Sequence, residues 1–317
     1  MNKNSVIFLA GHKGLVGSAV YRKLREKGYY KIITVERKKL DLRDFEKTLK
    51  YFKNKKIDYM IMAAARAGGI LANSHYQKNF FFENIEIQNS LLKFALKKKI
   101  KRTIYLGTSC IYPKFAKNPI KENSLLTGKL EKTNQSYAIA KIAGIKLCET
   151  LYEDDKLDIV CLMPTNIYGI NDNFDKFSGH VIPAMIRKIF DAKIKKQKQL
   201  SLLGTGRPIR EFLFSDDLAE GIIIVLKKSK KSIFRACNNQ FPIINIGSGK
   251  SISIKSLSKK ISKLSGFKGK IIFDSKYPDG TMKKNLNSSI IRSLGWKPKT
   301  SLLNGLKKSI EFYVKTK

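Results

Sequence analysis

Tyr137 and Lys141 stand four residues apart within residues 136–149, a stretch rich in alanine, leucine and isoleucine that predicts a helix. Ser136 or Asn134 is the expected N-cap residue. Positions i and i+4 lie on one helix face, so the ammonium and the phenol would be neighbours. A lysine cation favours the phenolate and lowers a tyrosine pKa that starts near about 10. Tyr137 is therefore a candidate proton donor, although many helices carry such a pair as a packed ring beside a solvated ammonium.

A glycine turn follows the first predicted strand. Residues 5–10 are mainly apolar and predict a buried strand, Gly11, Gly14 and Gly17 follow, and residues 18–27 predict a helix. Glycines let backbone N–H groups approach a pyrophosphate at a helix N-terminus. Such a turn is weakly specific by itself, but its position between a strand and a helix favours a dinucleotide site.

The end of the second predicted strand, residues 31–35, bears on cofactor choice. Glu36, Arg37 and Lys38 come directly after it. An acid at this point holds a free ribose 2′-hydroxyl, whereas an arginine accepts a 2′-phosphate. Arg37 and Lys38 favour NADP, and Glu36 keeps NAD open.

Further strands are predicted over residues 58–65, 103–107 and 158–162. Helices are predicted over residues 41–52, before the first of these strands, and over 80–97, between the first and the second. This alternation predicts a doubly wound parallel sheet of the α/β class. Thr108 and Cys110 follow one of these strands, where ligands bind in such sheets. Thr108 can hydrogen-bond a substrate oxygen. Cys110 is either an acid or base or a small buried apolar side chain.

Two later features are candidates for ligand contact. His180, one of three histidines, lies in a Ser-Gly-His loop, although a lone loop histidine is usually just solvated. Residues 204–212 form a glycine-flanked basic turn that could take a phosphate.

The composition is extremely basic, with 63 lysines and arginines against 25 acids and a formal charge of +38. The charge indicates either a patch for nucleic acid or an anionic surface, or lysines spread over a soluble fold. The lysine runs lack interleaved aromatic residues, which favours the second interpretation. The four cysteines show no C-x-x-C spacing, so neither a metal site nor a secreted disulfide framework is predicted. With no apolar run of about 20 residues and no signal peptide, a cytoplasmic location is expected.

The chain resembles the extended short-chain dehydrogenase/reductase family over essentially its full length. The general marks are the glycine turn, Y-x-x-x-K from Tyr137, Thr108, and R-E-F-L-F-S-D-D from Arg210. Longer and more specific matches are A-G-H-K-G-L-V-G-S-A from Ala10, A-A-A-R-A-G-G-I from Ala63, S-C-I-Y-P-K from Ser109, S-Y-A-I-A-K-I-A-G-I-K-L-C-E from Ser136, M-P-T-N-I-Y-G from Met163, D-N-F from Asp172, H-V-I-P-A from His180 and P-D-G-T from Pro278.

The longer matches are to members of the family that act on GDP-4-keto-6-deoxy-D-mannose. The resemblance implies epimerisation at carbons 3 and 5, followed by reduction at carbon 4 with NADPH, to give GDP-L-fucose. It implies that Cys110 and His180 are the base and acid of epimerisation. It also implies that Tyr137 protonates the carbon-4 oxygen, and that Lys141 lowers the tyrosine pKa and holds the nicotinamide ribose. Thr108 stands where the family more often has serine, and it keeps the hydroxyl.

The matched positions imply two binding sets and no metal. The cofactor would be lined by Gly11, His12, Lys13, Gly14, Leu15, Val16, Gly17, Arg37, Leu106, Gly107, Thr108, Ser109, Lys141, Pro164, Thr165, Asn166, Ile167 and His180. The nucleotide sugar would meet Lys188, Leu203, Arg210 and Asp279. Leu203 stands where the family often has tryptophan, and Lys188 where it often has arginine, so ring stacking and a bidentate phosphate contact are in doubt.

The expected architecture is a Rossmann sheet with a smaller C-terminal α/β lobe. Residues 1–165 would form the NADP-binding domain, joined by strands that return from the later chain, and residues 166–317 mainly the nucleotide-sugar lobe. The resemblance implies a homodimer paired through long helices that include the Tyr137 helix. The alternatives are another extended-family epimerase or 4-reductase, or a basic Rossmann protein that senses nucleotides or binds nucleic acid. Cys110 with His180 argues against a plain reductase, and Tyr137 with Lys141 against a sensor.

Overall fold

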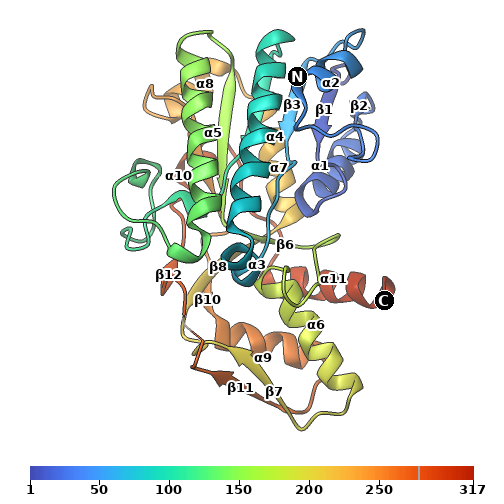
Figure 1. The fold of residues 1–317 in the computed structure, drawn as a ribbon, viewed down its shortest axis with the longest axis vertical. Coiled ribbons are helices and arrows are strands. Elements are labelled where there is room, and N and C mark those ends of the chain that lie inside the picture. Colours follow the sequence, from blue (N-terminus) through green and yellow to red (C-terminus); the bar gives the residue numbers. More distant parts are fainter. Residues whose placement is uncertain (278) are drawn as a thin grey trace.

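The computed structural model describes residues 1–277 and 279–317, and Figure 1 shows an upper and a lower lobe. Pro278, which starts the P-D-G-T match, lies outside the described residues. In chain order the elements are β1 (Ile7–Ala10), α1 (Leu15–Glu26), β2 (Ile32–Ile33), α2 (Phe45–Tyr51), β3 (Tyr59–Met62), α3 (Ile70–His75), α4 (Gln77–Lys97), β4 (Arg102–Leu106), η1 (Ser109–Ile111), η2 (Glu122–Ser124), η3 (Lys132–Asn134), α5 (Gln135–Glu153), β5 (Ile159–Pro164), β6 (Asn166–Tyr168), α6 (Val181–Ile194), β7 (Gln199–Leu203), β8 (Ile209–Phe214), α7 (Ser215–Lys227), α8 (Lys230–Ala236), β9 (Ile243–Ile246), β10 (Ser251–Ser253), α9 (Ile254–Ser265), β11 (Lys270–Asp274), β12 (Lys283–Lys284), α10 (Ser289–Ser293) and α11 (Leu302–Lys315).

The central sheet of the upper lobe has six strands in the order β2-β1-β3-β4-β5-β9. Every neighbouring pair is parallel, and Leu9 on β1 lies opposite Ile61 on β3. The strands are short apolar runs because helices cover both faces of the sheet. The predicted doubly wound parallel sheet is confirmed.

Side-chain alternation along β1 divides the core of this lobe into two parts. Phe8 joins a cluster with Leu91 of α4 and Ile145 of α5 on one face of the sheet. Leu9 joins a second cluster with Val20 of α1 and residues of α7 on the other face. Helices α4 and α5 run side by side down the first face, as Figure 1 shows.

The lower lobe is built around β8. This strand pairs with β6, β10 and β12, while β7 pairs in parallel with β11. Helices α6, α9 and α11 supply a separate apolar core that includes Ile186, Leu257 and Ile310. The polypeptide returns to the upper sheet through α7 and β9. At the lobe junction, Thr165 after β5 and Gly249 after β9 both donate hydrogen bonds to Glu211 of β8.

Element boundaries differ from the predicted ones by a few residues. Helix α1 begins at Leu15 because Gly14, with an extended backbone, takes the N-cap position. Helix α2 begins at Phe45, since the carboxylate of Asp44 accepts a hydrogen bond from the Lys47 N–H at 2.9 Å. The strand predicted over residues 31–35 is shortened to β2, which pairs with β1 through two residues only.

Of the helices in the described part of the chain, none combines the length and the hydropathy that a membrane span needs.

Candidate active site

The glycine turn between β1 and α1 forms a backbone cradle. Gly11 has a φ of +85°, and a Cβ on it would lie 2.5 Å from the backbone nitrogen of Ala64. A Cβ on Gly17 would overlap the carbonyl of Gly11. Helix α1 has no side-chain cap, which leaves N–H groups of its first turn directed at the turn. This arrangement fits the pyrophosphate of a dinucleotide.

A cavity of about 350 Å³ opens beside this cradle, after the ends of β1 and β2. It is lined by His12, Thr34, Val35, Glu36, Lys38, Lys39 and Tyr51. Burial lowers the pKa of His12, Lys13 lowers it further, and Glu36 acts the other way. The Nδ1 atom of His12 is buried and has no hydrogen-bond partner within residues 1–277 and 279–317. Two lysines lining a cavity of this size fit the phosphate-bearing adenosine end of NADP. The sequence analysis did not predict a role for Lys39, because it considered only Glu36, Arg37 and Lys38 after this strand.

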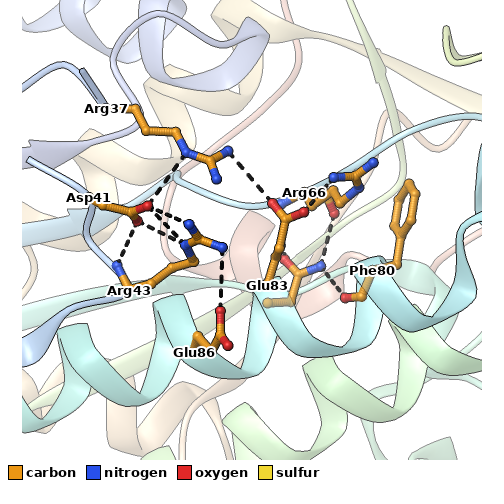
Figure 2. A network of polar contacts seen from close by, with 8 residues as sticks. Arg37, Asp41, Arg43, Arg66, Phe80, Glu83 and Glu86 are labelled. Atoms are coloured by element: carbon orange, nitrogen blue, oxygen red, sulfur yellow. Dashed lines mark hydrogen bonds and ion pairs between the residues drawn. The ribbon is translucent and has the colours of Figure 1, made fainter.

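Arg37 lies outside this cavity lining, in the network of Figure 2. Its guanidinium is 3.8 Å from the carboxylate of Asp41 and 3.6 Å from that of Glu83. Glu83 is also paired with Arg66, whose guanidinium lies over the ring of Phe80 at 5.4 Å. Arg37 therefore belongs to an ion-pair network with Asp41 and with Glu83 of α4, and its contact with a 2′-phosphate stays a prediction.

Thr108, Cys110 and Tyr137 meet beyond the carboxyl end of β4. The Thr108 hydroxyl accepts a hydrogen bond from the Cys110 N–H at 3.2 Å and so caps η1. The same side chain is close enough to the Tyr137 phenol to lower its pKa. The structure thus brings together residues predicted from two separate segments, the turn with Thr108 and Cys110 and the helix with Tyr137.

Lys141 lies one turn along α5 and is only 4% exposed. Its Nζ donates a hydrogen bond to the carbonyl of Leu106 at 2.9 Å and sits 4.9 Å from the centre of the Tyr105 ring. Burial lowers the pKa of Lys141 to about 8. The lysine is therefore partly neutral near physiological pH.

Burial raises the pKa of Tyr137, Cys110 raises it further, and Thr108 lowers it. The expectation that Lys141 lowers the tyrosine pKa omitted this burial, which is the largest influence in the structure. A raised pKa keeps the phenol protonated, which suits a proton donor more than a base.

Cys110 is the half-buried member of the four free cysteines, and the others are buried in the core. The Nδ2 of Asn134 donates a hydrogen bond to its Sγ at 3.3 Å. Asn134 takes the expected N-cap position of α5, but its side chain makes no capping hydrogen bond. Ser136 does not cap the helix either, since its Oγ bonds to Oε1 of Gln77 at 3.1 Å. One feature of the sequence could have indicated the contact between Asn134 and Cys110, namely that Asn134 lies three residues before Tyr137.

His180 stands at the N-cap position of α6, and burial lowers its pKa. Its loop packs on the chain after β3, where the Gly69 N–H donates to the Ser178 carbonyl at 2.9 Å. A side chain on Gly68 would press on Ser178 and on Phe80. The Phe80 ring in turn meets Tyr137 edge-on at 6.0 Å. The histidine loop therefore packs on Gly68 and Gly69, and Phe80 packs between Gly68 and Tyr137.

The residues predicted for the nucleotide sugar fall into two groups. Arg210 on β8 is close enough to Cys110, Asp279 and Glu131 for all three to raise its pKa, although burial lowers that pKa more. Asp279 accepts hydrogen bonds from the Thr205 N–H at 3.0 Å and the Thr205 hydroxyl at 2.6 Å, and so holds the glycine-flanked turn.

The second group lies deeper in the lower lobe. Lys188 is half-buried on α6, and burial lowers its pKa. Leu203 ends β7 and is partly exposed. Both are positioned by elements of the lower lobe rather than by the turn at Cys110.

The stretch after β5 links the lobes. Pro164 is buried at the end of β5 and Ile167 lies in β6. The Thr165 hydroxyl and the Asn166 Nδ2 both donate to the backbone carbonyl of Glu211, at 3.1 and 2.9 Å. These predicted cofactor residues therefore also join the upper sheet to β8.

Comparison with known proteins agrees with this architecture. The model of the NAD dependent epimerase/dehydratase family matches residues 7–247. The chain belongs to that family. It is 44% identical to the GDP-L-fucose synthase of Sinorhizobium fredii over 308 residues, 97% of this chain and 95% of that protein. It is 42% identical to the putative GDP-L-fucose synthase 2 of Arabidopsis thaliana over 314 residues, 99% of this chain and 93% of that one.

The fold is also similar to a crystal structure of a GDP-D-glycero-L-gluco-heptose synthase from Campylobacter jejuni in the presence of NADPH. The TM-score is 0.90 at 32% identity, with 99% of each chain covered. The family resemblance inferred from the motifs is confirmed.

Proposed function

We propose that this protein converts GDP-4-keto-6-deoxy-D-mannose into GDP-L-fucose with NADPH, by epimerisation at carbons 3 and 5 and reduction at carbon 4. The observation that supports it most is the placement of Cys110 and Tyr137 around Thr108. The Cys110 N–H donates to the Thr108 hydroxyl, and Cys110 is close enough to Tyr137 to raise the pKa of the phenol. A base therefore lies beside the group that protonates the carbon-4 oxygen. The relatives named above, similar over nearly the whole chain, bear that activity in their names.

The chemistry starts from the carbon-4 ketone, which acidifies the hydrogens on carbons 3 and 5. Cys110 and His180 act as base and acid in their exchange. Negative charge then develops on the carbon-4 oxygen. Tyr137, held by Thr108, donates a hydrogen bond to that oxygen and later its proton.

The cofactor is NADPH, which when bound supplies a hydride to carbon 4. Gly11, Gly14 and Gly17 would hold its pyrophosphate, and the cavity with Lys38 and Lys39 would hold the adenosine 2′-phosphate. The buried Lys141, hydrogen-bonded to Leu106, would orient the nicotinamide ribose. The other predicted lining residues would complete the contact.

The GDP group would lie over the lower lobe. Arg210 supplies a cation near Cys110, and Asp279 keeps the 204–206 turn in place. Lys188 offers a point charge to phosphate where a guanidinium would offer a fork, and Leu203 offers apolar contact without ring stacking.

We further propose a homodimer in which α4 and α5 pair with their copies in the partner. The outward faces of these helices carry exposed apolar side chains, namely Phe82 at 55%, Ile139 at 39% and Leu96 at 37% exposure. Burying such side chains would favour association. Residues 1–165 are proposed as the cofactor domain and residues 166–317 mainly as the sugar lobe. A cytoplasmic location agrees with four free thiols.

The test is NADPH consumption with GDP-4-keto-6-deoxymannose in heavy water, followed by mass and NMR analysis of the product. A fucose product with deuterium at carbons 3 and 5 is the expected result. If NADPH is consumed but no deuterium enters the product, the protein is a plain 4-reductase. If no NADPH is consumed, GDP-4-keto-6-deoxymannose is not its substrate.

A second candidate is reduction or epimerisation of another GDP-linked keto sugar. The similarity to the heptose synthase favours it, because that protein shares the fold over the whole chain. A 4-keto heptose linked to GDP would be consumed faster than the deoxymannose compound if this alternative holds.

A further inference from the structure

Asn134 is the N-cap residue of α5, a position where an asparagine side chain ordinarily hydrogen-bonds to the helix backbone. An asparagine at an N-cap accepts a hydrogen bond from an N–H of the first helical turn. Asn134 precedes α5 directly, yet its side chain makes no such bond. Its Nδ2 points to Cys110 Sγ at 3.3 Å, and its Oδ1 is buried without a partner among the described residues. Among the described residues, the side-chain amide of Asn134 therefore bonds to the sulfur of Cys110.

The hydrogen bond from Asn134 to Sγ stabilises the thiolate form of Cys110 more than the neutral thiol. A thiolate is an acceptor, so an amide N–H directed at it stabilises the charged form and lowers the thiol pKa. A neutral thiol gains less from the same donor, because its sulfur is a weak acceptor. The geometry therefore favours the form of Cys110 that can accept a proton.

We propose that Asn134 is a positioning residue for Cys110. It holds Sγ in place beside Thr108 and Tyr137 and increases the thiolate fraction. The part of this inference that involves proton transfer from the sugar rests on the proposed function. The effect on the thiol itself does not require the sugar.

Other charged or titratable groups also face Cys110. Tyr137 approaches from α5 and Arg210 from β8, with Glu131 near Arg210. Glu131 is itself paired with Lys114 at 3.0 Å. These groups remain in place in an Asn134 variant, so the change in thiol behaviour on substitution reports the amide contribution.

The experiment measures the rate of Cys110 alkylation by iodoacetamide between pH 5 and pH 10 in the folded protein, with the modified peptide identified by mass spectrometry. The remaining cysteines are buried, which gives Cys110 the fast reaction. Asn134→Ala is expected to lower the alkylation rate at neutral pH about tenfold, because the amide no longer stabilises the thiolate. Asn134→Asp, nearly isosteric but anionic, is expected to lower that rate further. Gln135→Ala, at the exposed first residue of α5, should keep the wild-type profile.

An unchanged pH profile in both Asn134 variants would overturn the proposal. Asn134→Asp also keeps a side chain able to cap α5, so it supplies the result if the alanine variant does not fold. Deuterium exchange into the keto sugar is then compared at saturating substrate, where both Asn134 variants should lose about tenfold in kcat with little change in KM. If the wild type shows no exchange at all, the proposed function fails while the thiol titration still decides the role of Asn134.

Discussion

The ammonium of Lys13 lies 2.7 Å from the carboxylate of Glu36. Lys13 belongs to the glycine turn, and Glu36 follows β2 and lines the cavity beside it. Glu36 is the residue that kept NAD open as the cofactor. Its carboxylate is already paired with the Lys13 ammonium, and this ion pair holds Lys13 beside the cavity. The pairing with Lys13 lowers the pKa of Glu36, so this acid is ionised at neutral pH.

Glu36→Gln should improve the use of NADPH. The substitution removes a negative charge from a cavity that also contains Lys38 and Lys39, and it releases Lys13 for a phosphate. The side chains of the pair are exposed, so the effect should be modest, about a threefold fall in the KM for NADPH and a rise in that for NADH. Steady-state kinetics with each cofactor measures it, with Glu46→Gln as an exposed control. A higher KM for NADPH would show that Glu36 helps to hold the cofactor.

Lys39→Ala should weaken NADPH binding more than Arg37→Ala does. Lys39 lines the cavity, whereas Arg37 is engaged by Asp41 and Glu83. We expect about a fivefold to tenfold rise in the KM for NADPH in the lysine variant, diminishing at high salt because the interaction is electrostatic. Lys31→Ala, at the other end of β2, serves as the matched control. The opposite ranking would mean that Arg37 leaves its network when the cofactor binds.

Tyr137→Phe should stop reduction and spare hydrogen exchange. It deletes the phenolic proton and the contact with Thr108 but leaves Cys110 and His180 in place. Loss of a general acid typically costs about 10²- to 10⁴-fold in rate. NADPH oxidation and deuterium uptake are followed in parallel, with Tyr30→Phe as a solvent-exposed control. Equal loss of both activities would contradict the division of roles.

Deprotonation of Lys141 should increase the free energy of unfolding as the pH rises from about 8 to 10. The lysine binds its proton with a pKa of about 8 when folded, against an ordinary value of 10.5, because burial disfavours the charge. Between these values the unfolded chain carries the proton and the folded protein does not, so the free energy of unfolding increases with pH. Relative to Lys141→Met, the gain is at most about 3 kcal/mol.

Urea denaturation at several pH values measures this difference, with Lys146→Met, exposed on the same helix, as the control. A wild type that gains no stability over Lys141→Met across this range would show that the lysine stays protonated in the folded protein.

The sequence by itself determined the sheet and the glycine cradle. Short apolar strands alternate with helical segments, and only glycine tolerates the φ of Gly11 and the close approach at Gly17. Tyr137 and Lys141 follow from helical spacing, which is a local property. Long family matches added the roles of Cys110 and His180, which spacing could not supply.

Only the tertiary structure decided how the groups near Cys110 behave. Burial depends on contacts between distant segments, so the opposite pKa shifts of Tyr137 and Lys141 were beyond any local pattern. The turn of Asn134 away from its helix toward sulfur likewise depends on where η1 meets α5. Sequence spacing determines which residues share a face, whereas desolvation and hydrogen-bond choice are set by the packing of that face against the rest of the chain.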